Sequence, residues 1–117
     1  MDDEAIKLLF GKTITGLELK DDQLTLTLED RVKLKLRDNV RSCCESRYMG
    51  TDDNLADHIG SQLLGVRVLD APDQDAGGDV HEVQFLIIDT DKGGLTISNH
   101  VEHNGYYGGF DIEAEIE

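Results

Sequence analysis

Two ten-residue stretches of this chain repeat one another: FGKTITGLEL at residues 10–19 and IGSQLLGVRV at residues 59–68. Both glycines and the alternating apolar positions fall 49 residues apart. Each stretch leads into two further alternating segments, which predicts two related β-β-β units at about residues 8–40 and 57–100. A three-stranded unit has too small an apolar face to be stable alone, so we expect both units to pack into one domain covering residues 1–117. Chance similarity between two simple strand patterns is the alternative.

The segments between turn signals are short, rich in Leu, Val, Ile and Thr, and apolar at every second position, which is typical of strands. The expected strands cover residues 12–19, 23–28, 31–37, 63–69, 81–89, 95–100 and 110–116. The alternation stops between residues 41 and 59, and a long polar loop is expected at residues 71–78. A short helix is expected around residues 52–59, after the capping side chains of residues 51–54. The predicted class is α+β, mostly β: two related three-stranded antiparallel units plus a C-terminal strand and one short helix.

The charge is large and unevenly distributed along the chain. The 117 residues include 25 acidic and 11 basic side chains, a net charge of -14. Residues 1–50 hold 10 acidic and 9 basic residues, a balance of -1, whereas residues 51–117 hold 15 acidic and 2 basic residues, a balance of -13. A surface of this sign repels nucleic acid and anionic membranes and attracts basic proteins. The ordinary alternative is that the carboxylates only keep a small β protein soluble.

The hydropathy of the sequence argues for a cytoplasmic protein. The longest apolar run, residues 85–88, has four residues, too few for a membrane-spanning helix. The acidic start MDDE lacks the basic and apolar parts of a signal peptide. We therefore expect the protein in the cytosol of its host cell.

Two segments carry charge at every second position. Basic side chains alternate with apolar ones at Arg31, Lys33, Lys35 and Arg37, and carboxylates do so at Asp111, Glu113, Glu115 and Glu117. Same-side residues repeat at roughly 6.6 Å along a strand, so the carboxylates form a regular ladder that could imitate backbone phosphates. Alternatively, the two strands are neighbours and their ladders neutralise one another, the interpretation we favour. An acidic binding surface would then consist of Asp52, Asp53, Asp57, Asp70, Asp73, Asp75, Asp79 and Glu82.

The sequence carries no motif for catalysis. Residues 11–13, Gly-Lys-Thr, match the end of a phosphate-binding loop, but Ile6 replaces the glycine required five residues earlier. Residues 89–93 begin like a calcium loop, yet His100 stands where its glutamate belongs, so a hairpin turn is predicted. We expect no enzymatic activity and no cofactor.

Cysteines and histidines show no spacing typical of zinc ligands. Cys43 and Cys44 are adjacent, which disfavours a disulfide between them. The four histidines are His58, His81, His100 and His103, without a paired spacing. In an extended segment, residues 100 and 102 share one face and residue 103 lies on the other. We expect no metal site.

A glycine-rich segment near the C-terminus, NGYYGGF at residues 104–110, holds two of the three tyrosines. Glycine permits close backbone approach, so Asn104, Tyr106 and Tyr107 could form a binding surface on a rigid turn. The alternative is a turn whose tyrosines cover the core.

Four segments together resemble a small domain family that recurs in bacteriophage and prophage genomes. They are GKTI at residues 11–14, CCES at 43–46, DHIG at 57–60 and NGYY at 104–107. The likeness spans most of the chain, and CCES and NGYY are its distinctive elements. One departure is GLTIS at residues 94–98, where the family has an aromatic-rich strand. The resemblance implies a phage or prophage origin and no catalytic residue.

These features predict a small, acidic, non-enzymatic phage-type protein that binds a basic host protein. The expected effect is inhibition of a nucleic-acid-handling or defence protein, as anti-CRISPR proteins do, by occupying its phosphate groove. No direct nucleic acid or membrane partner is expected. One alternative is a binding module that stacks a nucleotide-like ligand on Tyr106 and Tyr107. Another is a structural accessory protein that forms a homo-oligomer without a dedicated ligand.

Overall fold

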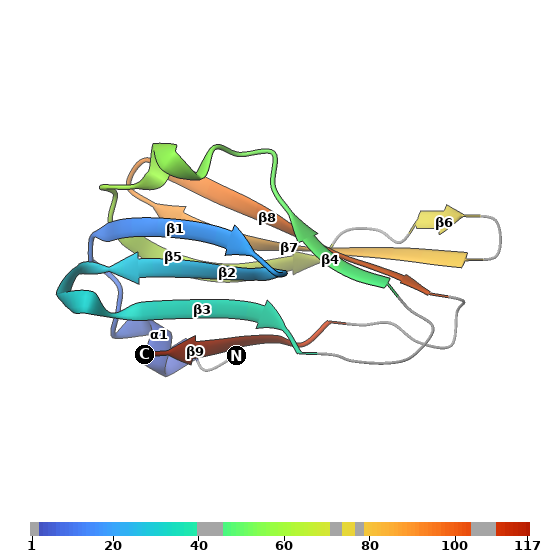
Figure 1. The fold of residues 1–117 in the computed structure, drawn as a ribbon, viewed down its shortest axis with the longest axis horizontal. Helices are drawn as coiled ribbons and strands as arrows, with labels where there is room; N and C mark the ends of the chain where they lie inside the picture. The colour runs from blue at the N-terminus through green and yellow to red at the C-terminus, as the bar shows by residue number, and fades with distance from the viewer. Residues whose placement is uncertain (1–2, 40–45, 71–73, 77–78, 104–109) are drawn as a thin grey trace.

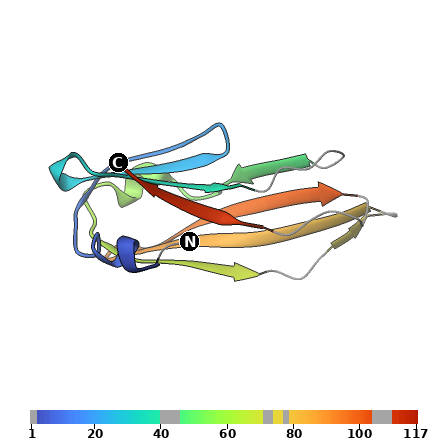
Figure 2. The same ribbon diagram turned by 90° about the horizontal axis from the view of Figure 1, so that it is seen from below.

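The protein is an elongated body of two stacked β-sheets, with extents of 47 × 24 × 22 Å (Figure 2). The computed structural model describes residues 3–39, 46–70, 74–76, 79–103 and 110–117. The mostly β class predicted from the alternating sequence is confirmed.

Every strand pairing in the two sheets is antiparallel within this described part (Figure 1). The first sheet contains, in order, β1 (Ile14–Lys20), β2 (Gln23–Leu28), β3 (Lys33–Asp38) and β9 (Ile112–Ile116). The second contains β4 (Ser46–Gly50), β8 (Gly93–His103), β7 (Asp79–Thr90) and β5 (Leu63–Asp70), and the short β6 (Gln74–Ala76) pairs with β7. The helical segments are α1 (Asp3–Lys7) and the one-turn 3-10 helices η1 (Glu29–Arg31) and η2 (Leu55–His58).

Each sheet is completed by a strand from the other half of the chain. β4 follows β3 in sequence but pairs with β8 in the second sheet. β9 follows β8 but pairs with β3 in the first sheet (Figure 1). The two three-stranded units predicted from the repeat are therefore interlocked, and neither has a complete four-stranded sheet on its own.

Reciprocal backbone hydrogen bonds connect the two copies of the repeat. Gly11 N donates to Leu63 O, and Gly60 N donates to Ile14 O, both at 2.7 Å. Adding 49 to the residue numbers 11 and 14 gives 60 and 63, so each bond is the counterpart of the other. The two stretches of the predicted repeat are therefore joined by equivalent hydrogen bonds.

The two copies also share their irregular features. Gly11 and Gly60 have φ angles of 92° and 91°, a conformation that strongly favours glycine. β1 has a register shift before Gly16 and β5 has one before Gly65. Sequence similarity at residues 10–19 and 59–68 therefore reflects a shared backbone path as well as shared apolar positions.

The core lies between the sheets and is built from the inward-facing residue of each alternating pair. Its fully buried members include Leu24, Leu26, Leu34, Leu36, Leu86, Ile88, Leu95 and Ile97. Burying one such side chain contributes about 1.5–3 kcal/mol relative to leaving it exposed. These buried residues form one contiguous cluster.

All seven strands predicted from the sequence are present, and the two longest, β7 and β8, extend beyond the predicted residues 81–89 and 95–100. The strand at residues 23–28 has the predicted bounds. The strand expected from residue 31 begins at Lys33, because Asp30 and Arg31 have φ angles of 64° and 62° within η1. The predicted cap is confirmed at Asn54, whose side chain accepts a hydrogen bond from Ala56 N, but the helix is a single 3-10 turn.

The short elements that were not predicted include α1, β4 and β6, besides η1. β4 lies where the apolar alternation stops, since Arg47 occupies one of its inward positions and Met49 the other. The Arg47 guanidinium binds the Asp38 carboxylate of β3 at 2.6 Å, and both side chains are only 11% exposed. β6 lies inside the expected loop at residues 71–78, and both α1 and β6 are too short for a sequence period to show.

Candidate functional site

The second sheet is longer than the first. β7 and β8 have 12 and 11 residues, whereas β2 and β3 have six each. In the two registers, Lys20 pairs with Gln23 and its counterpart Leu69 pairs with Phe85. Residues of β7 before Phe85 therefore have no counterpart in the first sheet. We call residues 46–49, 79–84 and 99–103 the extension; Figure 1 shows β7 and β8 projecting past the end of the first sheet.

The outer face of the first sheet is charged and internally paired. Lys35 lies opposite Glu115, and Arg37 opposite Glu113. Lys35 Nζ donates to Glu117 Oε1 at 2.8 Å, and this contact raises the pKa of Lys35 and lowers the pKa of Glu117. The favoured interpretation of the two ladders, as neighbouring strands, is confirmed. The acidic ladder is thus matched by bases of its own sheet.

The outer face of the second sheet is apolar at equivalent positions. The polar pair Lys20–Gln23 of the first sheet corresponds to Leu69–Phe85 in the second. Leu69 is 53% exposed. Ile87 lies on the same face as Phe85, two residues further along β7, but only 9% of it is exposed. The outer face of the second sheet is therefore apolar around Leu69 and Phe85, while Arg67, opposite Ile87, pairs with Asp89 further along the same face.

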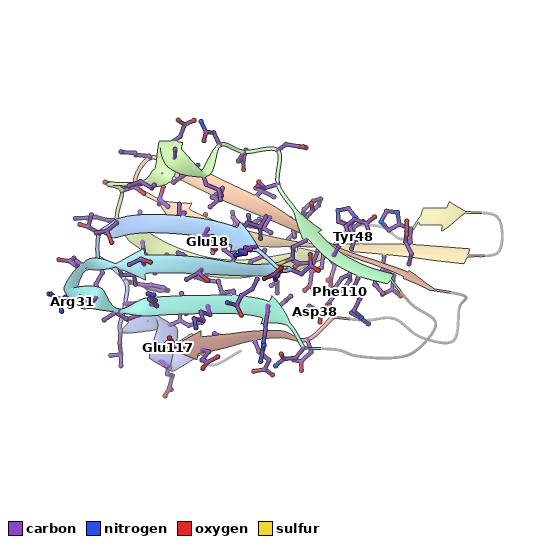
Figure 3. All side chains as sticks on the ribbon, in the orientation of Figure 1. Glu18, Arg31, Asp38, Tyr48, Phe110 and Glu117 are labelled. Carbon is purple, nitrogen blue, oxygen red and sulfur yellow. The ribbon has the colours of Figure 1, made fainter. Side chains whose placement is uncertain are left out.

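Three rings adjoin this apolar face on the extension. Tyr48 of β4 lies opposite His100 of β8, and their rings stack with centroids 4.6 Å apart and planes 6° apart. His81 Nε2 lies 2.8 Å from His100 Nδ1, so one imidazole donates a hydrogen bond to the other. Figure 3 shows Tyr48 at the side where the second sheet projects past the first.

Burial and nearby charge hold two of these rings in their neutral forms. Burial, followed by the charge of His81, lowers the pKa of His100 from 6.5, and Glu102 opposes this effect. Burial and Glu102 raise the pKa of Tyr48 above 10. At neutral pH the stack therefore consists of a phenol and an uncharged imidazole. Residues 100 and 102 both lie in β8, so they share a face of the strand as predicted.

Val83 lies opposite His100 and joins the ring cluster to Phe85. We define the aromatic face as Tyr48, Leu69, His81, Val83, Phe85 and His100. It crosses all four main strands of the second sheet. An apolar surface of this kind on a small domain marks a binding site more often than a random distribution of exposed side chains does.

The predicted acidic residues do not form one patch among the described residues. Asp52, Asp53 and Asp57 are exposed and lie around η2. η2 adjoins the Thr90 end of β7, because His58 Nδ1 lies 3.5 Å from Thr90 Oγ1. The extension is at the opposite end of that strand. The carboxylate of Asp53 also accepts a hydrogen bond from Thr96 N at 2.8 Å.

A second acidic group lies at or beside the extension. Asp70 is exposed at the end of β5, where its carboxylate accepts a hydrogen bond from Gln84 Nε2 at 2.7 Å. Glu82 and Glu102 lie in the extension itself. Asp111, Glu113 and Glu115 belong to the first sheet or its approach, and the side chain of Asp38 accepts from Asp111 N at 3.0 Å.

Several predicted residues fall outside the described part of the structure. They are Asp73, Asn104, Tyr106 and Tyr107, together with Cys43 and Cys44. The side chains of Asp75 and Asp79 are also outside it. The aromatic turn at residues 104–107 therefore stays a prediction.

Among the described residues, no group of three or more His, Cys, Asp or Glu side chains could hold a metal ion. Two surface hollows measure about 140 Å³, beside Lys35 and Glu113, and about 290 Å³, between Phe10 and Arg67. Both are smaller than typical small-molecule pockets of roughly 300–1,000 Å³. No helix of the described part is long and apolar enough to span a membrane.

Sequence reasoning missed the ring cluster. Counting two-residue steps outward from the apolar runs of β7 and β8 places His81, Phe85 and His100 on the outer face. Tyr48 was hidden because β4 was not recognised as a strand. Its position opposite His100 depends on the exchange of fourth strands between the sheets, which short-range periodicity does not encode.

A family model described as a domain of unknown function (DUF7448) matches residues 7–112. The chain belongs to this family. The matched region includes both copies of the repeat and the aromatic face. No curated protein and no solved structure matches the chain.

Proposed function

We propose that this DUF7448 domain is a non-enzymatic binding module that docks a basic protein on the aromatic face. The observation that carries the proposal is the difference between equivalent positions: Leu69 and Phe85 stand where the first sheet has Lys20 and Gln23. Folding does not require apolar residues there, since the first sheet forms with polar ones. A separate requirement, such as contact with a partner, accounts for them.

The composition of the face suits a protein partner. Protein interfaces have apolar, aromatic centres surrounded by polar rims, and a few large side chains provide most of the binding energy. Here Leu69, Phe85 and Tyr48 supply such a centre. Glu102 supplies an acidic group on the same face, on β8.

The charge of the domain favours a basic partner. Residues 51–117 carry a balance of -13 and form β5, β6, β7 and β8 of the second sheet, together with β9 of the first. Such a field accelerates encounter with cationic surfaces and opposes close approach of two copies, each with a net charge of -14. A basic protein is therefore a better occupant of the face than a second copy of this chain.

A basic groove that normally holds phosphate would be blocked by such docking. We accordingly extend the proposal to inhibition of a nucleic-acid-handling or defence protein in the cytosol of a phage host. The imitation of phosphate would come from a carboxylate beside the aromatic face, Glu102, which lies opposite His81. The ladder of Glu113 and Glu115 contributes less, because those residues face Arg37 and Lys35.

The test gives the second sheet the residue types of the first sheet at one pair of equivalent positions. The variant Leu69→Lys with Phe85→Gln reproduces the Lys20–Gln23 pair on the second sheet, and Gln23→Lys adds the same single charge to the first sheet. A basic protein captured from host lysate by the wild type should bind at least tenfold more weakly to the double variant and unchanged to Gln23→Lys. Its affinity should also fall steeply between 50 and 500 mM salt.

Equal loss with both variants would mean that net charge alone governs capture and would exclude the aromatic face. Affinity indifferent to salt would exclude the basic partner. Thermal stabilisation by a small metabolite, without any protein capture, would instead support the small-ligand alternative.

A further inference from the structure

The ring of Tyr48 is held by its neighbours and remains accessible. His100 stacks against it with centroids 4.6 Å apart, and the hydrogen bond between His81 and His100 fixes the orientation of that imidazole. β4 is the edge strand of the second sheet, and Tyr48 is 38% exposed. A planar group can therefore contact the tyrosine ring without displacing a strand of this sheet.

A carboxylate accompanies the stacked rings. Glu102 follows His100 by two residues on the same face of β8, and it is close enough to act electrostatically on both Tyr48 and His100. Its side chain is exposed. The site thus combines an accessible aromatic ring, a neutral imidazole behind it and a solvent-facing negative charge.

These groups match the chemistry of a guanidinium ion. A guanidinium is planar, stacks on aromatic rings and donates two parallel hydrogen bonds to a carboxylate. A lysine ammonium has the same charge, but it is more strongly hydrated and has no flat surface to stack. The arrangement therefore distinguishes between the two basic side chains.

We infer that an arginine of the basic partner stacks on Tyr48 and pairs with Glu102. This inference rests on the proposed function and adds the anchor residue that the partner contributes. A partner that presents arginine should therefore bind more tightly than a lysine-rich partner of equal charge.

Two peptides of equal charge, tetra-arginine and tetra-lysine, test the inference with the full chain. By titration calorimetry at low salt, the wild type should bind tetra-arginine about three- to tenfold more tightly than tetra-lysine. Tyr48→Phe should keep this preference, because the hydroxyl group is not needed for stacking, and Tyr48→Leu should abolish it. Glu102→Gln should weaken tetra-arginine binding more than Glu18→Gln, which removes the same charge from an exposed position on the first sheet.

Chemical-shift mapping of the wild type covers the case in which Tyr48→Leu does not fold. Tetra-arginine should shift the Tyr48 and His100 resonances more than tetra-lysine does. Equal affinity for both peptides, a preference that survives in folded Tyr48→Leu, or shifts confined to other residues would overturn the arginine site. In those cases salt-dependent capture that still requires Leu69 and Phe85 would leave the proposed function standing.

Discussion

The two sheets share one backbone arrangement, but their outer faces carry different kinds of side chain. On the inner side the equivalent residues agree, since Leu24 of β2 and Leu86 of β7 are both fully buried. On the outer side they diverge, with Gln23 replaced by Phe85. Agreement inside reflects the common demand of packing the core, and divergence outside reflects different tasks for the two faces.

The two sheets also differ in the length of their strands, because β7 and β8 continue into the extension. Hydrogen bonding between β7 and β8 continues past the last residue pair that has a counterpart in β2 and β3. The added residues bring Tyr48, His81 and His100 together. A duplicated framework has thus been lengthened on one side only, at the point where the ring cluster lies.

The strongest test of the comparison is the core. Leu24→Ala and Leu86→Ala each remove a fully buried side chain at equivalent positions. Each should lower the free energy of unfolding by about 2–5 kcal/mol, through lost burial and a residual cavity. Urea unfolding followed by circular dichroism measures both. A large cost for one variant and almost none for the other would refute equal roles for the two inner faces.

A smaller effect is expected at the glycines that begin the repeats. Gly11→Ala and Gly60→Ala place a side chain at φ angles of 92° and 91°, and each should cost about 1–2 kcal/mol. The cost is backbone strain, since the new Cβ meets nothing within 4 Å at Gly11 and only Lys92 Nζ at 3.5 Å at Gly60. Unfolding midpoints compare the two variants directly.

Unequal destabilisation would show that the reciprocal bonds from Gly11 and Gly60 do not make equivalent contributions. Unchanged stability in both variants would show that the loops relax to ordinary φ angles. Either result would weaken the structural meaning of the repeat.

Much of the fold follows from the sequence because its long strands obey strict alternation. The repeat at residues 10–19 and 59–68 predicted both units, and the opposite ladders of β3 and β9 indicated their pairing. The exchange of β4 and β9 between sheets was not predictable in full. It is a long-range pairing, and β4 carries the inward Arg47 in place of an apolar signal.

The candidate site was less accessible to sequence reasoning than the fold. The carboxylates chosen from the sequence include Asp70 and Glu82, which lie at the end of β5 and in the extension but on the face of the sheet opposite the aromatic face. The aromatic face depends on comparing equivalent residues across two sheets, such as Lys20 with Leu69. That comparison needs the register as well as the sequence.

The smallest expected effect is a pH dependence of stability that comes from His100 in the extension and has no counterpart in the first sheet. All four histidines belong to the second half of the chain. The pKa of His100 is lowered by burial and by His81, while Glu102 opposes the shift and Tyr48 stacks on the ring. Below pH 6.5 the unfolded chain therefore binds a proton at this residue more readily than the folded one. The stability contributed by neutral His100 should be complete above pH 6.5 and decrease as the pH falls toward the folded value.

His100→Gln isolates this contribution because glutamine stays neutral and can still bond to His81. Urea midpoints at pH 7.5 and 5.5 should differ less in His100→Gln than in the wild type. They should differ more in Glu102→Gln, which removes the charge that favours protonated His100, and Glu18→Gln on the first sheet should behave as the wild type does. An identical pH dependence in His100→Gln and the wild type would mean that other groups carry it. The first sheet places no histidine on its outer face. Such a result would therefore mean that pH sensitivity does not distinguish the two outer faces.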